Sequence, residues 1–380
     1  MKKKLAIIGA SYLQRPLVEK CKELGVYSIC FAWEEGAVCK DLCDKFYPIS
    51  TVDKEAILKA CQEEKIDGVI TIASDVATLT VNYVAEKMGL VGNPDKYSQT
   101  ATNKYLMRQC FMEHDVPSPK FCLTEGQIPE IINTFSFPVI VKPTDRSGSR
   151  GVEKVLKRED LQEAIERACK ESFQKKAVIE EFVEGCEISV ESISYQGKHH
   201  ILQITDKVTT GSPFFVELEH HQPSSLPEDV KQRVRKIVLC ALDALHIKYG
   251  ASHAELKITE DGDIRVIEIG ARMGGDFIGS DLVKLSTGYD FLKGVIDVAF
   301  GEFEEPELTD HKCSGVYFLC KETESILPII QNSENYPEIV RAEVTDPVLR
   351  RIEQSADRSG YFIYQSTKRE KYEEISINRF

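Results

Sequence analysis

Strand-like and helix-like segments alternate along the N-terminal quarter of the chain, and this alternation limits the fold more than any other feature of the sequence. Short apolar segments with the length of strands lie at 5–9, 27–31 and 68–72. Amphipathic segments with the period of helices lie at 16–24, 54–64 and 76–88. Parallel strands need long crossovers, which helices usually supply. The pattern therefore predicts βαβ units and a parallel sheet in an α/β fold.

The composition predicts a cytoplasmic globular protein of two or three domains. The chain has 380 residues and a net charge of -13, and this charge argues against nucleic-acid or anionic-membrane partners, which favour basic surfaces. No apolar stretch approaches the ~20 residues that span a bilayer. The apolar run after the basic residues 2–4 is too short for a signal peptide. The 12 cysteines lack the spacing of a zinc site, so we interpret them as free thiols.

Beyond the first domain, the pattern changes twice. A helix predicted at 102–114 is followed by Pro117 and Pro119, which mark a boundary. Residues 202–225 are polar and poor in helix signals, and we interpret them as loops over a site. After a helix at 289–300 the chain becomes strand-rich. The remaining predicted elements are strands at 137–142, 151–156, 177–181, 187–194, 315–319, 338–344 and 360–365, and helices at 160–171 and 228–245.

Two acidic residues stand out in a predicted hairpin. Alternating apolar and polar segments flank Asp261-Gly262, a strong signal for a two-residue type I′ turn. With these two residues as the turn, Glu255 lies directly opposite Glu268, with Cβ atoms roughly 4.5–5.5 Å apart. Like charges so close need a cation, and Mg²⁺ accepts one or two carboxylates besides water and phosphate oxygens. A solvated hairpin face, on which Lys257 neutralises its neighbours, explains the pair equally well.

A predicted strand ends at Lys142 and is followed by a loop rich in Ser, Gly and Arg at 145–151. Small residues let backbone N–H groups approach phosphate oxygens, and arginines add charge. The spacing is not that of a Walker A loop, and predicted strands flank the loop, so it would be a mobile hairpin flap. An ordinary hairpin turn is the alternative. The acidic linker at 179–187, Ile-Glu-Glu-Phe-Val-Glu-Gly-Cys-Glu, then joins two predicted strands.

In this order the segments resemble the ATP-grasp superfamily: a strand-end lysine, a Ser/Gly flap, an E-E-F-V-x-G-x-E linker, then two glutamates followed by an arginine. The resemblance includes a preceding α/β domain like that of the biotin carboxylase and carbamoyl phosphate synthase branch. The run 268–276, Glu-Ile-Gly-Ala-Arg-Met-Gly-Gly-Asp, is similar to the carboxylate–amine ligases, including L-amino-acid ligases. The implied division is an N-terminal domain at 1–98, an ATP-grasp domain at 99–300 with a lid at about 115–185, and a β-rich closing subdomain at 301–380.

The resemblance assigns nucleotide contacts to residues of this sequence. It implies that Lys104 and Lys142 contact the phosphates of ATP. The flap would close over these phosphates with Ser147, Gly148, Ser149, Arg150 and Gly151. Glu180 would face the adenine amino group, and Glu181 and Val183 would offer backbone groups to adenine. Glu187 would hold the ribose hydroxyls.

The resemblance also assigns the metal and catalytic roles. Glu255 and Glu268 would bind one or two Mg²⁺ ions, for which Mn²⁺ can substitute. Lys207 and Arg272 would act near the transferring phosphoryl group and the acyl phosphate. Many relatives carry Asn two residues after the second glutamate, whereas this sequence has Gly270. A water molecule could fill that gap, so the ligands of a second Mg²⁺ are open.

The implied reaction is an ATP-dependent ligation of a small carboxylate and an amine, with amino acids as the expected substrates, through an acyl phosphate. A homodimer is compatible with this reading. One alternative is a bicarbonate-using ATP-grasp carboxylase, and another is a nucleotide-binding protein without catalysis. We interpret the histidines His220, His221 and His253 as substrate contacts or packing residues rather than metal ligands. Asp75 could reach the cleft, although an N-cap role for Ser74 or Asp75 is simpler, and Arg358 is interpreted as structural.

Overall fold

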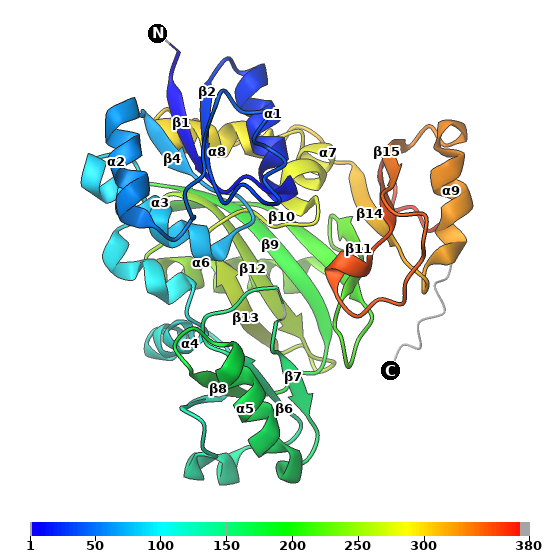
Figure 1. The fold of residues 1–380 in the computed structure, drawn as a ribbon. Coiled ribbons are helices and arrows are strands. Elements are labelled where there is room, and N and C mark those ends of the chain that lie inside the picture. Colours follow the sequence, from blue (N-terminus) through cyan, green and yellow to red (C-terminus); the bar gives the residue numbers. More distant parts are fainter. Residues whose placement is uncertain (1, 149, 373–380) are drawn as a thin grey trace.

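A computed structural model describes residues 2–148 and 150–372, which build three β-sheets (Figure 1). The first sheet is parallel, has the strand order β3-β2-β1-β4, and carries helices on both faces. Its strands are β1 (Lys4–Ile8), β2 (Tyr27–Phe31), β3 (Lys45–Tyr47) and β4 (Gly68–Ile70). Its helices are α1 (Arg15–Glu23), α2 (Lys54–Glu64), α3 (Asp75–Met88) and α8 (Phe291–Phe300). The predicted parallel sheet is therefore confirmed.

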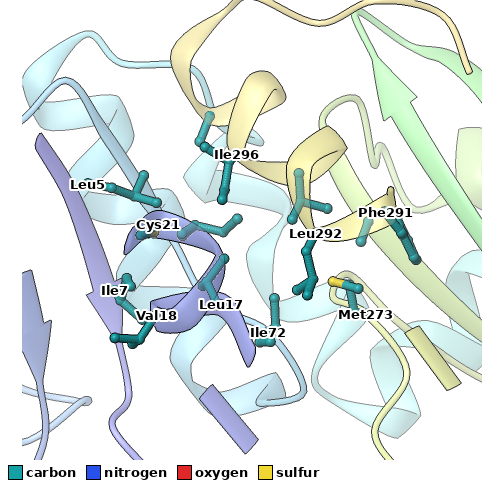
Figure 2. Packing of buried hydrophobic residues seen from close by; sticks show 14 of the residues in the cluster. Leu5, Ile7, Leu17, Val18, Cys21, Ile72, Met273, Phe291, Leu292 and Ile296 are labelled. Atoms are coloured by element: carbon teal, nitrogen blue, oxygen red, sulfur yellow. The ribbon is translucent and has the colours of Figure 1, made fainter. Parts of the chain in front are cut away.

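Alternation along β1 explains why both faces of the first sheet are covered. Leu5 and Ile7 lie in one apolar cluster with residues of α1 and α8, whereas Ala6 and Ile8 lie in the opposite cluster with residues of α2 and α3. Figure 2 shows the first of these clusters, in which Met273, distant from the first sheet in the sequence, packs with residues of that sheet. This shared core joins the first sheet to the segment that follows the predicted carboxylate pair.

The second sheet is antiparallel with the order β5-β8-β6-β7. Its strands are β5 (Phe121–Thr124), β6 (Val139–Pro143), β7 (Glu153–Val155) and β8 (Ala177–Glu181). Apolar side chains of α5 (Leu161–Glu171) share one buried cluster with all four strands. Helix α4 (Lys104–Glu113) leads into this sheet and contacts β5. The loop between β6 and β7 is the predicted flap.

The central sheet has eight strands in the order β13-β12-β9-β10-β11-β14-β16-β15. They are β9 (Cys186–Tyr195), β10 (Lys198–Thr209), β11 (Glu217–Gln222), β12 (Gly250–Ile258), β13 (Ile264–Gly270), β14 (Cys313–Leu319), β15 (Ile339–Val344) and β16 (Gly360–Ser366). The interpretation of 202–225 as loops is wrong, because β10 and β11 occupy most of it. Polar side chains along these two strands hid the apolar alternation that marks a strand.

The predicted limits of the domains stay a prediction. The C-terminal strands β14, β15 and β16 continue the central sheet, and α8 packs against β4 of the first sheet. Three further helices are α6 (Glu228–Ala244), α7 (Val283–Thr287) and α9 (Leu327–Gln331). In the part of the chain that the structure describes, no helix has the length and apolarity needed to cross a bilayer.

The two faces of the central sheet differ in chemistry. One face packs against α6 through buried residues such as Val190, Leu256 and Val266 on the strands and Val238 and Leu242 on the helix. On the opposite face, Glu187, Ser189 and Glu191 of β9 and His253, Glu255 and Lys257 of β12 follow at every second position, as the strand period requires. This polar face is where the predicted site residues meet.

Candidate active site

Strand register brings distant polar residues into rows across the polar face. One row runs from Glu268 through Glu255 to Ser189, on β13, β12 and β9. A neighbouring row joins Gly270, His253 and Glu191 on the same strands. A third row joins Lys257, Glu187, Lys207 and His220 on β12, β9, β10 and β11. The sheet therefore collects residues from five strands into one patch.

The predicted pairing of Glu255 with Glu268 is confirmed, but the predicted turn is wrong. Thr259 N–H donates to the Asp263 carbonyl at 2.9 Å, so the hairpin loop has three residues, with Gly262 at a φ of 84°. This loop alone would shift the register by one residue. A bulge at the position of Ile267 shifts it back, because Leu256 pairs with Val266 while Glu255 still pairs with Glu268.

Lys207 lies at the centre of a carboxylate cluster. Its Nζ is 2.8 Å from Glu187 Oε1, 2.7 Å from Glu255 Oε1 and 3.4 Å from Glu217 Oε1. Burial alone would lower the pKa of Lys207, but these carboxylates raise it well above its usual value. Burial would raise the pKa of Glu255, and the charge of Lys207 instead holds it well below its usual range. Both groups are therefore charged at neutral pH.

Helix α4 supplies two cations to the site from one face, because Lys104 and Arg108 are separated by one helical turn. Lys104 Nζ lies 2.7 Å from Glu268 Oε1. Arg108 donates to the Glu180 carboxylate at 3.2 Å and to the Ile267 carbonyl at 2.6 Å. Its Nε also lies 2.9 Å from Glu180 Oε1, but without the geometry of a hydrogen bond, so we count it as an ion pair.

Glu180 is a buried acceptor for two cations. Lys142 Nζ, at the end of β6, lies 2.8 Å from Glu180 Oε2, and both side chains are at most 5% exposed. Burial raises the pKa of Glu180, but Arg108 and Lys142 together lower it below its usual value. Burial is also the main reason why the pKa of Lys142 is lowered. The predicted contacts of Glu180 with adenine and of Lys142 with phosphate stay predictions.

The flap and the linker lie where the sequence predicted them. Ser147, Gly148, Arg150 and Gly151 belong to the turn between β6 and β7, and Ser149 lies outside the described residues. The base of the flap is tied to α4, because Lys104 N–H donates to the Thr144 carbonyl at 2.7 Å. In the linker, Glu181 N–H donates to the Lys120 carbonyl at 2.9 Å. The Val183 N–H has no protein acceptor among residues 2–148 and 150–372.

Arg272 reaches from the end of β13 to the first sheet. Its Nε lies 2.8 Å from Asp75 Oδ1, and a second guanidinium nitrogen lies 3.1 Å from Asp75 Oδ2. Burial would raise the pKa of Asp75, and the Arg272 charge lowers it instead. Of the two residues considered for the N-cap, Ser74 occupies that position but makes no side-chain cap bond, and Asp75 is the first helical residue. The cleft interpretation of Asp75 is the one that the contacts support.

The comparisons with known proteins agree with this geometry. The model of the ATP-grasp domain matches residues 135–281, which include the flap, the linker, Lys207, Glu255, Glu268 and Arg272. This part of the chain is therefore similar to ATP-grasp domains. The crystal structure of an L-amino acid ligase from Bacillus licheniformis superimposes with a TM-score of 0.80 and 26% identity over 97% of this chain and 94% of that chain.

Two curated ligases are similar over part of the chain. A D-alanine–D-alanine ligase of Phocaeicola vulgatus is 32% identical over 151 residues, which are 38% of this chain and 46% of that protein. An alanine–anticapsin ligase of Bacillus subtilis is 25% identical over 273 residues, which are 65% of this chain and 57% of that protein. The chain thus spans about half the length of the curated relatives it matches.

Sequence reasoning missed several residues of the candidate site. Arg108 could have been found, because it follows Lys104 by four positions on a predicted helix. Glu191 is buried and connects two elements, with Oε2 accepting the Gly274 N–H at 3.0 Å and Oε1 facing His253 Nδ1. Burial lowers the pKa of His253, but Glu191 and Glu255 raise it to about 9. No local pattern marks Glu191.

The segment just before β16 adds one arginine to the other end of the polar face. Arg358 lies 2.8 Å from Asp276 Oδ2 and donates to the Glu217 carbonyl at 2.9 Å. Its guanidinium lies 3.9 Å from the ring centre of Phe318. His220 lies nearby, 3.8 Å from Asp276 Oδ2. The ring nitrogens of His220 are buried and have no hydrogen-bond partner in the described part of the chain. Arg358 therefore braces a region next to Lys207.

Proposed function

We propose that this chain is an ATP-dependent carboxylate–amine ligase, which forms an amide or peptide bond through an acyl phosphate and releases ADP and phosphate. The observation that carries the proposal is the carboxylate pair, Glu255 directly opposite Glu268, with a cation on each side. Lys207 contacts Glu255 and Lys104 contacts Glu268. A solvated hairpin face would not bury both of these lysines, which are 3% and 7% exposed.

The residues fit a magnesium ion held with a nucleotide. Glu255 and Glu268 keep 29% and 26% of their side-chain surface exposed, so both can still accept a ligand. Among the described residues, no group of three or more His, Cys, Asp or Glu side chains could hold a metal by itself. Mg²⁺ typically uses one or two carboxylates and completes its shell with water and phosphate oxygens. When bound, it neutralises phosphate charge.

The nucleotide contacts follow the order of elements around the pair. Lys104 and Lys142 approach from α4 and β6, and the flap between β6 and β7 stands beside them. Val183 offers a backbone N–H at the linker, and the Glu181 carbonyl is the second group for adenine. Glu187, 2.8 Å from Lys207, lies between the linker and the carboxylate pair, where the ribose would be. These placements support the assignments made from the sequence.

In the proposed reaction, the main contribution of the chain is fixed positive charge near the reacting groups. In the first step a carboxylate oxygen of the acid attacks the γ-phosphorus, and the bond to the bridging oxygen of ADP breaks. In the second step the amine nitrogen attacks the acyl carbon, phosphate leaves, and the amine releases one proton. Lys207 and Arg272 stay protonated throughout, so they stabilise the charge that develops on the transferring group. A closed flap would exclude water from the acyl phosphate.

Small amino acids are the proposed substrates, with a homodimer as the proposed assembly. The names of the similar ligases support amino acids, since they are D-alanine, alanine or L-amino acid ligases. The region around Arg358, Glu217 and Asp276 offers both charges that a zwitterion needs, and His220 adds unpartnered ring nitrogens. ATP as a substrate and cysteines that are all free support a cytoplasmic location.

The test is ADP release measured over a matrix of amino acids and small carboxylates, with the masses of the products determined. We expect ADP release that needs both an acid and an amine, together with a product of the ligated mass. Glu268→Gln should lower this activity at least about 100-fold, because one of the two metal carboxylates loses its charge. Its urea midpoint should stay close to that of the wild type. Bicarbonate-dependent ADP release, or near wild-type activity of Glu268→Gln, would contradict the proposal.

A further inference from the structure

A single ion pair connects the first sheet directly with Arg272. Asp75, the first residue of α3, meets the Arg272 guanidinium with both carboxylate oxygens, at 2.8 and 3.1 Å. Such a two-point contact fixes the plane of the guanidinium as well as its position. The third guanidinium contact is with the carbonyl of the neighbouring Met273, at 3.1 Å. The orientation of Arg272 therefore depends on a residue from another part of the fold.

The chain is held in an uncommon conformation so that Asp75 reaches this place. Ala73, two residues before it, has a φ of 54°, which residues other than glycine seldom adopt. Gln14 holds the preceding Ile72 from both sides: its Oε1 accepts the Ile72 N–H at 3.1 Å, and its Nε2 donates to the Ile72 carbonyl. The strained backbone is thus fixed just before α3 begins.

Gly270 gives the Asp75 carboxylate its space. A Cβ atom at position 270 would lie 2.6 Å from Asp75 Oδ1 and 3.0 Å from Arg272 Nε. Contacts below 3.0 Å essentially never occur for real Cβ atoms, and Asp75 cannot yield without losing Arg272. The gap that the sequence suggested beside Gly270 is therefore filled by the Asp75–Arg272 pair rather than left for water.

Close packing holds Met273, the residue next to Arg272, more firmly than it holds the Arg272 side chain. Met273 is 1% exposed and lies in the same apolar cluster as Ile72 and Leu292 (Figure 2). A cavity of about 60 Å³ borders Arg272 between the first and central sheets. The guanidinium is therefore not held by close packing on that side, and polar contacts must orient it.

We infer that Asp75 is a positioning residue that orients the Arg272 guanidinium for the reaction, and that residue 270 is glycine because a side chain there would displace Asp75. This inference rests on the proposed function, since Arg272 acts on the reacting groups only in the ligase reaction. It makes the first sheet part of the working site.

The first test separates orientation from stability. Asp75→Ala should lower the kcat of ADP release about 10- to 100-fold, while the KM for ATP changes less than about threefold, because no nucleotide contact is lost. Asp75→Asn, which keeps the shape and one acceptor, should lose less. The matched control is Lys20→Met, which removes a 2.8 Å ion pair between α1 and Asp290, the N-cap residue of α8. It should lower the urea midpoint without lowering kcat. Equal kcat in Asp75→Ala and Lys20→Met would overturn the inference.

The second test needs no turnover. Gly270→Ala should lower the urea midpoint by roughly 0.5 M or more, and the same change in an Asp75→Ala background should lower it clearly less, because the clashing carboxylate is gone. Additive shifts would refute the spatial coupling of Gly270 and Asp75. If the wild type releases no ADP with any substrate pair, the proposed function fails, and this cycle still decides the coupling.

Discussion

Lys207→Met removes a buried cation that several partly buried carboxylates share, and we expect it to destabilise the protein strongly. The ammonium is 3% exposed and lies within 2.8 Å of both Glu187 and Glu255. Removing one partner of a fully buried ion pair costs about 3–5 kcal/mol, mainly because the other charge stays behind. The two glutamates are 19% and 29% exposed, so water can solvate them in part. This solvation reduces the expected loss to about 2–3 kcal/mol.

Urea unfolding followed by circular dichroism measures this loss, with Lys257→Met as the matched control. Lys257 lies on the same face, 3.5 Å from Glu187 Oε2, and is 17% exposed. Its removal should cost less than about 1 kcal/mol, as for exposed pairs. Methionine preserves most of the apolar stem in both variants, so the difference between them reports the buried charge. Equal shifts in the two variants, or a loss below about 0.5 kcal/mol for Lys207→Met, would refute the reasoning.

A double variant tests whether the loss comes from stranded charge. Lys207→Met with Glu255→Gln removes both partners of the 2.7 Å contact. The double variant should be more stable than Lys207→Met alone, because a neutral amide tolerates burial better than an unpaired carboxylate. A double variant less stable than either single variant would point to lost packing rather than lost charge compensation.

Two further predictions concern stability. Gly262→Ala should cost about 1 kcal/mol in urea unfolding, because the residue has a φ of 84° while an added Cβ would meet only Arg233, at an ordinary contact distance of 3.8 Å. Gly275→Ala, with open space and no positive φ, is its control, and equal losses would contradict a conformational cause. Lys45, with Tyr47, lowers the pKa of Glu64 to about 2 from an ordinary value of 4.5, so this carboxylate stabilises the fold above pH 4.5 and loses its effect as the pH falls toward 2. Glu64→Gln should therefore cost about 1 kcal/mol at pH 7 and nothing near pH 2, and a deficit that is the same at both values would exclude the pKa shift as its cause.

Local signals predicted most of the helices and strands. The helix at 54–64 and the strand at 27–31 have the predicted bounds, because each carries its own pattern and its own ends. Asp53, for example, caps the helix by accepting the Ala56 N–H at 3.2 Å. β10 and β11 were missed because a strand that lines a polar site shows polar residues where the pattern expects apolar ones. The site itself thus hides the strands that build it.

The sequence predicted residues of the candidate site and their order along the chain, but not the contacts that hold them together. The motif order identified Lys104, Lys142, Glu255, Glu268 and Arg272 together. The contacts that hold these residues join segments far apart in the sequence, such as Asp75 with Arg272 and Arg108 with Glu180. A single sequence carries no signal for such pairs, because each partner alone is an ordinary charged residue. Only the fold shows which charges are buried together.

The carboxylate pair depends on one of these distant contacts. The bulge at Ile267 restores the register that the three-residue loop would shift, and the Ile267 carbonyl accepts a hydrogen bond from Arg108 at 2.6 Å. Arg108 also holds Glu180, next to Lys142. The same arginine therefore connects the side proposed for the metal with the side proposed for the nucleotide. A turn signal at 261–262 could suggest that Glu255 and Glu268 face each other, but the pairing is secured by a bulge and an arginine that no hairpin pattern contains.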